Sequence, residues 1–156
     1  MGVKPTIDVE MQFSGSAGAW PSVRTDVLSN PGITAKYGIF GDGPLDRVAN
    51  PGSMDLELRN DAGNSGAKQG YYSPSSSSLR SGFAIGIGAR LKITYSGSTF
   101  YKWSGWVDGI APQPGKFLAQ RTGVRCADWF DRVATQKVRF MPIGRSLRSD
   151  VAVACV

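Results

Sequence analysis

Apolar and polar residues alternate with a period of two along several short stretches of the chain. The alternation has no error in residues 6–13, and it recurs in residues 54–58 and 89–95. A period of two is that of a strand with one buried face and one solvated face. We therefore predict three half-buried strands in these stretches. Their predicted core positions are Val9, Met11, Leu56, Leu58, Leu91 and Ile93.

Turn-forming residues separate these strands and predict another strand between them. The tripeptide Asn-Pro-Gly occurs at 30–32 and again at 50–52. In a type II turn Pro suits the second position and Gly accepts the positive φ of the third, so each tripeptide predicts a turn that introduces a strand. The first turn leads into a strand over 33–39, and the second leads into the strand that contains Leu56. Residues 23–28 fit either a short strand or an irregular turn.

The second half of the chain predicts a hairpin and a final strand. Ser-Gly-Ser at 96–98 fits a hairpin turn between the strand over 89–95 and an aromatic-rich strand over 99–110. Gly105 interrupts the aromatic-rich strand, which marks a bulge or a close approach of another backbone. Residues 116–126 predict the last strand.

A long break without periodicity extends from Asn60 to Gly82. It contains several Gly and Asn residues and a run of four serines. A loop of this length inside one domain is typical of a binding loop or of a solvated excursion. We expect it to contact another protein, to be anchored by Tyr71 and Tyr72, and to become ordered only in the assembled particle.

Composition and the C-terminal pattern complete the predicted fold. Residues 127–133 lose the period of two and predict a short helix, and residues 146–156 carry apolar residues at near-helical spacing. The 20 Gly and 9 Pro of the 156 residues favour many strands joined by turns. We therefore predict a mainly β protein, an antiparallel β-sandwich or barrel with a long loop and one or two short helices near the C-terminus. The β-rich domain covers 1–140, and a helical extension over 141–156 is either the start of a further region or a tail that packs on a neighbour.

Charge is distributed unevenly along the chain. Residues 1–78 hold 6 Lys or Arg and 8 Asp or Glu, whereas residues 79–156 hold 12 and 4, which gives −2 and +8 within a net charge of +6. A basic half of this kind serves either nucleic acid or an acidic protein neighbour. We expect the protein neighbour and regard a basic OB-like nucleic-acid binder as the lesser candidate. The expected basic contact residues are Arg121, Arg125 and Arg132.

The sequence contains no sign of a membrane span or of a secreted, disulfide-stabilised domain. No apolar run approaches about 18 residues, and the N-terminus lacks the basic start and apolar core of a signal peptide. We therefore expect synthesis and folding in a cytoplasm. Cys126 and Cys155 are far apart in unlike contexts, which favours buried free thiols over a disulfide or a metal site.

The residue types that carry most enzyme chemistry are missing or stand in an unsuitable pattern. The chain has no histidine, which removes the Ser-His-Asp and Cys-His routes and the commonest zinc ligand. Most of its 12 carboxylates lie at alternating strand positions, where a solvated face is the simplest role. Asp61, Gly63 and Asn64 resemble a calcium loop only loosely, because the closing Glu is missing. We predict no catalytic residue, no metal site and no cofactor.

The aromatic residues of the strand over 99–110 have two interpretations. Exposed Trp rings can stack sugars or unpaired bases. Tyr101 and Trp103 share one face if the alternation is regular, and large aromatics at such positions are more often core or subunit interface. We favour the second interpretation and include Trp103 and Trp106 among the expected contact residues.

An ordered set of short motifs runs through the middle of the chain. It begins with Leu-Glu-Leu-Arg-Asn-Asp at 56–61 and Tyr-Ser-Pro at 72–74, which a serine run follows. It continues with Gly-Ala-Arg-Leu-Lys-Ile at 88–93 and Trp-Ser-Gly-Trp-Val-Asp-Gly-Ile at 103–110, and it ends with Val-Arg-Cys-Ala-Asp-Trp-Phe at 124–130. In order and spacing these motifs resemble the N-terminal domain of tail-tip or minor tail proteins of long-tailed bacteriophages and prophages. The resemblance covers about residues 6–135.

The resemblance implies a β-sandwich or barrel that assembles as a ring around the tail axis and connects the tail tube to the tip or baseplate. The partners it implies are copies of the chain itself and other tail tube, tip or baseplate proteins, and the location it implies is the virion tail. Trp103 stands where the family usually has Phe, and the family's chains continue past this domain through a helix that resembles 147–156. We therefore expect a structural protein and not an enzyme. The alternative is a carbohydrate-binding receptor-recognition module of the tail tip that uses Trp103, Trp106 and the polar loop.

Overall fold

The computed structural model describes residues 4–14, 18–38, 50–115 and 119–135. The elements formed by these residues are β1 (Thr6–Gln12), β2 (Thr34–Gly38), β3 (Asn50–Arg59), β4 (Gly88–Tyr95), β5 (Ser98–Gln113), β6 (Arg121–Ala127) and α1 (Trp129–Thr135). The strands form one antiparallel sheet in the order β1-β4-β5-β6-β3-β2. The mainly β fold predicted from the sequence is therefore confirmed.

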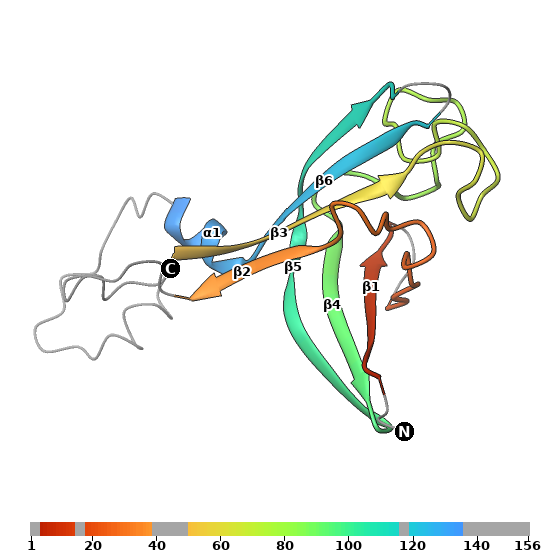
Figure 1. Cartoon of the computed structure of the whole chain (residues 1–156). Helices are drawn as coiled ribbons and strands as arrows, with labels where there is room; N and C mark the ends of the chain where they lie inside the picture. Colours follow the sequence, from red (N-terminus) through yellow and green to blue (C-terminus); the bar gives the residue numbers. More distant parts are fainter. Residues whose placement is uncertain (1–3, 15–17, 39–49, 116–118, 136–156) are drawn as a thin grey trace, which may run out of the picture.

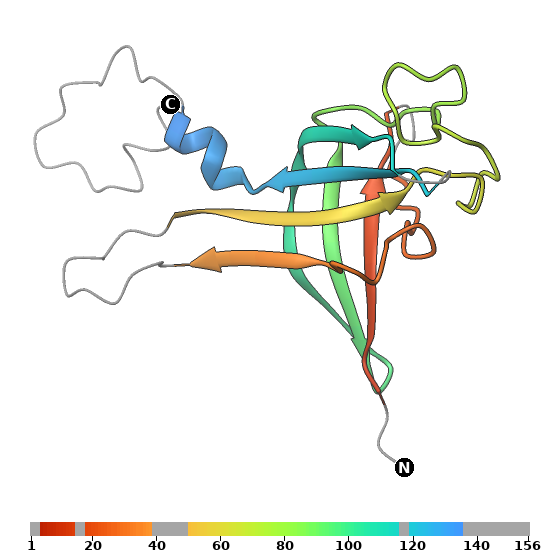
Figure 2. The same cartoon turned by 45° about the horizontal axis from the view of Figure 1, so that its top comes forward.

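Strand β5 carries the bend of the sheet. Its first half pairs with β4 and its second half with β6, and the register shifts once in each half, opposite Leu91 and Lys92 of β4 and between Val107 and Gly109 of β5. A bulge of this kind bends and twists a strand. Figures 1 and 2 show the result: β1, β4 and the start of β5 extend to the end of the molecule at which the N-terminus lies, while β2, β3 and β6 cross them in a different direction.

The segment between β1 and β2 connects two strands that are not neighbours in the sheet. The amide of Val23 donates to the carbonyl of Val9 in β1 at 2.8 Å, and the amide of Leu28 donates to the carbonyl of Glu57 in β3 at 2.9 Å. Residues 23–28 are therefore not a regular strand. They are an irregular segment that bridges β1 and β3 on the open side of the bent sheet.

The core lies on the inner face of this sheet, and five of the six predicted core positions are buried. Ile93 is only partly buried, because the start of β1 and the hairpin between β4 and β5 extend past the core. Its cross-strand neighbours there, Ile7 and Phe100, are about half exposed. The fully buried side chains include Val9, Met11, Val23, Met54, Leu58, Tyr72 and Val107.

The two Asn-Pro-Gly tripeptides have different roles. The first lies in a turn before β2, and Gly32 there has a φ of 84°. The second was predicted as a turn, and this prediction is wrong, because residues 50–52 are the start of β3. The amide of Gly52 donates to the Asp128 carboxylate at 2.8 Å, and a Cβ on Gly52 would come within 2.5 Å of that carboxylate. Gly52 therefore permits the close approach of a residue far away in the sequence.

Strand β5 contains one confirmed and one corrected prediction. A Cβ on Gly105 would overlap the carbonyl oxygen of Ala127, so Gly105 is a close-approach site as predicted. Tyr101 and Trp103, however, do not share a face. Lys102 is the extra residue of a bulge, so Trp103 lies opposite Leu91 on the core side while Tyr101 lies opposite Lys92 on the outer side.

The short predicted helix is confirmed as α1, which begins two residues later than expected. Asp128 precedes it, and its carboxylate accepts hydrogen bonds from the amides of Phe130 at 3.0 Å and Asp131 at 3.3 Å. An Asp in this position satisfies amides that have no partner within the helix. The last predicted strand is found as β6. Residues 116–118 of that prediction and the predicted extension over 141–156 lie outside the described residues.

Candidate interaction surfaces

The long loop between β3 and β4 is tied to the core by one buried carboxylate. Asp26 is 1% exposed and accepts three hydrogen bonds. The donors are the amide of Ser65 at 2.7 Å, the hydroxyl of Ser65 at 2.5 Å and the hydroxyl of Tyr72 at 2.5 Å. Arg80 donates in turn to the Tyr72 oxygen at 2.8 Å. Burial and the Asp26 hydrogen bond raise the pKa of Tyr72, so its hydroxyl stays protonated as a donor.

Two buried asparagines hold the rest of the loop in shape. The side-chain oxygen of Asn60 accepts from the amide of Tyr72 at 2.7 Å, and its amide group donates to the Ser73 hydroxyl at 2.7 Å. The amide group of Asn64 donates to the carbonyls of Asp61 at 2.6 Å and Lys68 at 2.7 Å. The loop was expected to order only on assembly. Its bonds to the core and within itself indicate instead that it is ordered in the isolated chain.

Aromatic rings pack around the same network. The Tyr72 ring makes edge contacts with Tyr71 at 5.2 Å and with Phe83 at 5.1 Å between ring centroids. The guanidinium of Arg80 lies 4.0 Å from the ring centroid of Phe13, which also packs against Phe83. Tyr72 is therefore a core residue and has no surface left for a partner, whereas Tyr71 is only partly buried.

Some of the expected contact residues are buried and others are exposed. Trp103, like Tyr72, is buried, so it anchors the core and does not face a partner. Trp106 is half-buried, and the guanidinium of Arg132 lies 4.1 Å from its ring centroid. Arg121 is exposed and forms an ion pair with Glu57 at 3.1 Å. Arg125 is exposed on the same strand, β6.

Large apolar side chains gather at two ends of the molecule. Of the eight that are exposed among the described residues, four lie where β1 begins and β4 and β5 meet at their hairpin, an end that we call the foot: Ile7, Tyr95, Phe100 and Tyr101. Three lie on β2 and α1, which flank the start of β3, and we call this end the arm: Tyr37, Trp129 and Val133. Figures 1 and 2 show that the arm and the foot extend in different directions, the arm to the left and the foot downward.

Sequence reasoning missed both ends. The alternation correctly assigns Ile7 to the apolar face of β1. It cannot show that no other element of the described chain covers this face near the hairpin. Exposure at the arm has a similar cause, because Trp129 and Val133 have the four-residue spacing of an ordinary buried helix face. The sequence gives one indication of this exposure, the shortness of the predicted helix, because the apolar face of so short a helix can contact few other residues.

The outer face of β3, β6 and β5 carries a shallow depression of about 480 Å³. Asp55 and Glu57 of β3 and Arg125 of β6 line it, and Gly109 and Gly123 leave its floor without side chains. Cross-strand register places Asp55 beside Arg125. The lining has both signs of charge and no aromatic ring, so it lacks the stacking platform that a sugar site uses.

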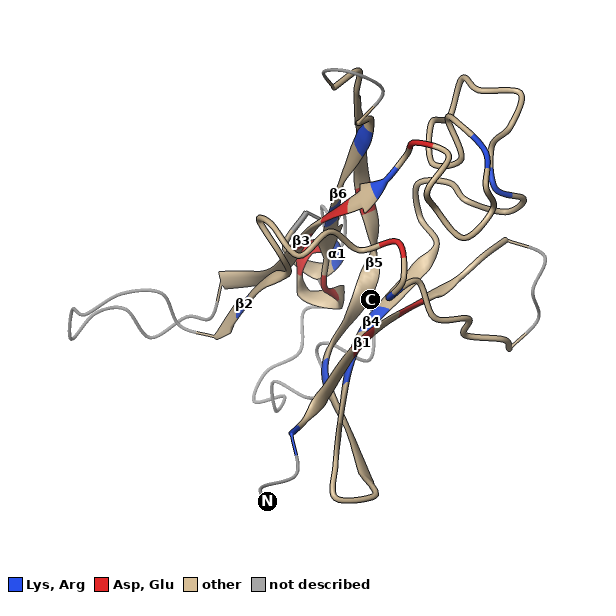
Figure 3. Cartoon of the chain, turned by 45° about the vertical axis from the view of Figure 1, so that its right-hand side comes forward, with Lys and Arg blue, Asp and Glu red and all other residues tan. Residues whose placement is uncertain are grey.

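Positive charge does not form a single patch on the described residues. Figure 3 shows Lys and Arg on the long loop, β4, β6 and α1, with Asp and Glu between them on neighbouring strands. The basic residues of the second half that the structure describes are therefore spread in space. A nucleic-acid site normally has its Lys and Arg on one face or along one groove.

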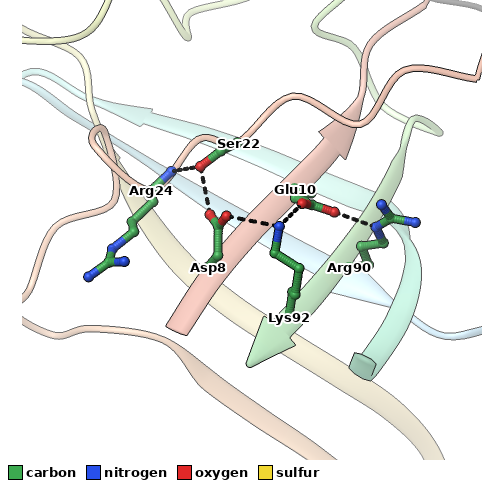
Figure 4. Close-up of polar contacts among 6 residues, drawn as sticks. All are labelled: Asp8, Glu10, Ser22, Arg24, Arg90 and Lys92. Carbon is green, nitrogen blue, oxygen red and sulfur yellow. Dashed lines mark hydrogen bonds and ion pairs between the residues drawn. The ribbon is translucent and has the colours of Figure 1, made fainter. Parts of the chain in front are cut away.

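A polar ladder joins the outer faces of β1 and β4 (Figure 4). Glu10 is largely buried and contacts both Arg90, at 2.6 Å, and Lys92. Lys92 also lies 3.4 Å from Asp8, whose carboxylate accepts from the Ser22 hydroxyl at 2.6 Å. Arg90 is further held between two rings, with its guanidinium 4.2 Å from the Trp20 centroid and 4.5 Å from that of Tyr101.

The pKa values of the ladder follow from these contacts. Burial alone would raise the pKa of Glu10, but the hydrogen bonds and charges of Lys92 and Arg90 together outweigh burial and hold that pKa below its ordinary value. The hydrogen bond to Glu10 is the main cause of a raised pKa at Lys92. Each partner therefore favours the charged form of the other.

The ladder should make folding stability depend on acid pH. A carboxyl whose pKa is depressed by folding contributes stability above its unfolded pKa, about 4.3 for Glu, and loses it as pH falls through the lower folded value. We expect Glu10→Gln to be less stable than the wild-type chain at pH 7 and the difference to shrink below about pH 4.3. Urea unfolding of both proteins between pH 7 and pH 2 measures this. A stability difference that stays constant over that range would show that the ion pairs of Glu10 with Arg90 and Lys92 do not stabilise the fold. The stability that comes from the raised pKa of Lys92 is lost only in strong alkali.

The described residues show no site for metal chemistry and no membrane helix. They contain no group of three or more Cys, Asp or Glu placed to hold a metal ion. Cys126 is a buried free thiol, and burial raises its pKa to about 12, which makes it a poor nucleophile. No helix among them is long and apolar enough to cross a membrane. No protein-family model and no curated protein matches the chain.

Proposed function

We propose that this chain is a structural subunit of a bacteriophage or prophage tail tip or baseplate. In this proposal several copies form a ring around the tail axis, which connects the tail tube to the tip, and the chain acts by assembly and not by catalysis. The resemblance of the motifs between residues 56 and 130 to those of tail-tip proteins supports the tail role, and the surface of the fold supports an assembly role.

The observation that carries the assembly role is the placement of exposed apolar side chains. In the part of the chain that the structure describes, seven of the eight large ones lie on the foot or the arm, and Ile85 is the exception. Singly scattered apolar residues are normal on a monomer, whereas grouped ones usually mark a contact with another protein. A ring subunit needs two such contacts, one for each neighbour.

The hydrogen-bonded loop over 60–82 supports the same role in another way. Its hydrogen bonds to Asp26 and its two buried asparagines fix its shape before any partner arrives. A loop that is already ordered loses little conformational entropy on binding. We propose that it is the surface on which other tail proteins dock.

Carbohydrate recognition receives less support from the site geometry. Of the two rings on which it relied, Trp103 is buried and Trp106 is covered on one side by Arg132. The depression on β3, β6 and β5 has no aromatic lining. A sugar site on this chain would therefore have to work without a stacked ring.

Locating the chain in intact particles tests the proposal. Gold-labelled antibody against this chain should mark the tail tip of purified particles, and the chain should remain with tails after heads are removed. Label on the head, or absence of the chain from purified particles, would contradict the tail role.

A further inference from the structure

The outer edge of β1 is covered along only part of its length. The segment over 21–23 lies along this edge, where the amide of Val23 donates to the carbonyl of Val9 at 2.8 Å. The chain then leaves β1 and crosses to β3 through residues 24–28. The edge of β1 over 6–8 therefore has no partner strand among the described residues.

The free backbone groups of this edge belong to Ile7. Successive residues of a strand direct their N–H and C=O groups to opposite sides, and the carbonyl of Val9 points outward, away from β4. The groups of Ile7, two residues earlier, therefore also point outward, whereas those of Asp8 face β4. Such outward N–H and C=O groups are the ones that an added strand binds. Because Pro5 has no N–H, the added strand has to be short.

An apolar notch of about 340 Å³ lies beside the uncovered edge. The apolar side chains that line it come from β1 and from the segment that follows 21–23: Ile7, Val9, Val27, Leu28 and Ile33. Residues that lie opposite each other on paired strands direct their side chains to the same face of the sheet. The residue of an added strand that lies opposite Ile7 would therefore direct its side chain into the notch. An apolar residue suits that position.

The free charges beside the notch are basic. Arg24 is exposed and lines the notch, and its guanidinium has no ion pair within the described part of the chain. Figure 4 shows its side chain pointing away from Asp8. Lys4 is exposed just before β1 and also lacks an ion pair there, whereas Asp8 and Glu10 are paired with the cations of β4. Lys4 and Arg24 lie toward opposite ends of the uncovered edge, so they favour an occupant with a carboxylate toward each end.

We infer that the uncovered edge of β1 binds an extended segment of another protein as an added strand. The segment has an apolar residue at its centre, which enters the notch, and acidic residues on both sides, which face Arg24 and Lys4. Its backbone pairs with the N–H and C=O of Ile7. A basic segment would meet charges of its own sign, and a small apolar molecule would leave these backbone groups unpaired. This contact adds to the proposed tail role and does not depend on it.

Calorimetric titration of the purified full chain with synthetic peptides tests the contact. The probe is acetyl-Thr-Glu-Thr-Leu-Thr-Glu-Thr-amide. We expect it to bind and to slow hydrogen exchange at the amide of Ile7, because the added strand supplies that amide with an acceptor. A peptide with Lys in place of both Glu residues, and one with Ser in place of Leu, should each bind at least about tenfold more weakly.

Charge reversal of the protein provides the complementary test. Arg24→Glu should weaken binding of the probe at least about tenfold and should strengthen binding of the Lys peptide. Lys36→Glu is the matched control, because Lys36 is an exposed lysine of β2 that does not line the notch and has no ion pair among the described residues. It should bind the probe as the wild-type chain does. Both variants should unfold in urea near the wild-type midpoint, since both positions are exposed.

Three results would overturn the contact. They are equal binding of the Glu and Lys peptides to the wild-type chain, equal binding of the probe to Arg24→Glu and wild type, and binding without slower exchange at Ile7. Decanoate that binds where the probe does not would also overturn it and would assign the notch to a small amphipathic carboxylate. Antibody labelling of particles is independent of the peptides, so failure of this contact and failure of the tail role are distinguishable.

Discussion

Replacing Leu58 with Asp should destabilise the fold by about 4–5 kcal/mol. Leu58 has no exposed surface, and β3 places it on the core face, in the buried cluster that also contains Met54 and Tyr72. A carboxylate there would lose its hydration without gaining a partner, and the core would also lose the packing of the leucine. Typical domains are stable by about 5–15 kcal/mol, so much of the variant should be unfolded at 37 °C.

Arg59→Asp is the matched control, because it introduces the same side chain one position further along β3 on the exposed face. We expect it to change stability by about 1 kcal/mol or less. Urea unfolding followed by far-ultraviolet circular dichroism measures both variants. Equal midpoints for Leu58→Asp and the wild-type chain would disprove the register of β3.

Replacing Asp26 with Ala should cost about 3–5 kcal/mol and loosen the loop over 60–82. Two donors of Ser65 and the hydroxyl of Tyr72 would lose their acceptor, and Tyr72 and Asp26 are both buried away from water. Leaving the buried Tyr72 hydroxyl without its acceptor costs about 1–3 kcal/mol, and the exposed Ser65 loses two hydrogen bonds worth about 1 kcal/mol each. Hydrogen exchange should therefore accelerate at Ser65 and Tyr72 more than at the amides of β4 and β5.

Asp61→Ala is the control for this second variant. Its carboxylate accepts from the amide of Gly63 at 2.7 Å in an exposed turn of the same loop, and water can replace it. We expect a loss below about 1 kcal/mol. If Asp26→Ala and Asp61→Ala have the same stability and the same exchange rates, the loop does not depend on its buried carboxylate.

The strands could be predicted because each has a regular pattern over its own length. The alternation that contains Val9 and Met11 indicates which face of β1 is buried. Ser96-Gly97 predicts a tight hairpin turn, and both residues have a positive φ in the structure. Failures arose where the pattern is broken by contacts distant in sequence. The bulge at Lys102 reverses the faces of Tyr101 relative to Trp103, and Gly52 is needed for Asp128, 76 residues away.

The contact surfaces were harder to predict than the strands. The loop over 60–82 has the composition of a mobile segment, yet its order depends on Asp26, which lies in a segment whose local sequence gives no regular pattern. From the sequence Tyr72 and Trp103 were expected to contact a partner, but the surrounding elements bury both side chains. The exposure of the arm and the foot depends on which other elements pack against them, and a single sequence does not specify this packing.

Electron cryo-microscopy of particles that contain this chain tests the central claim most directly. The proposal predicts a rotationally symmetric ring at the tail tip in which every copy of the six-stranded fold contacts two neighbours, with the loop over 60–82 facing another tail protein. A particle in which the chain occurs as isolated copies without ring symmetry, or lies away from the tail, would contradict it.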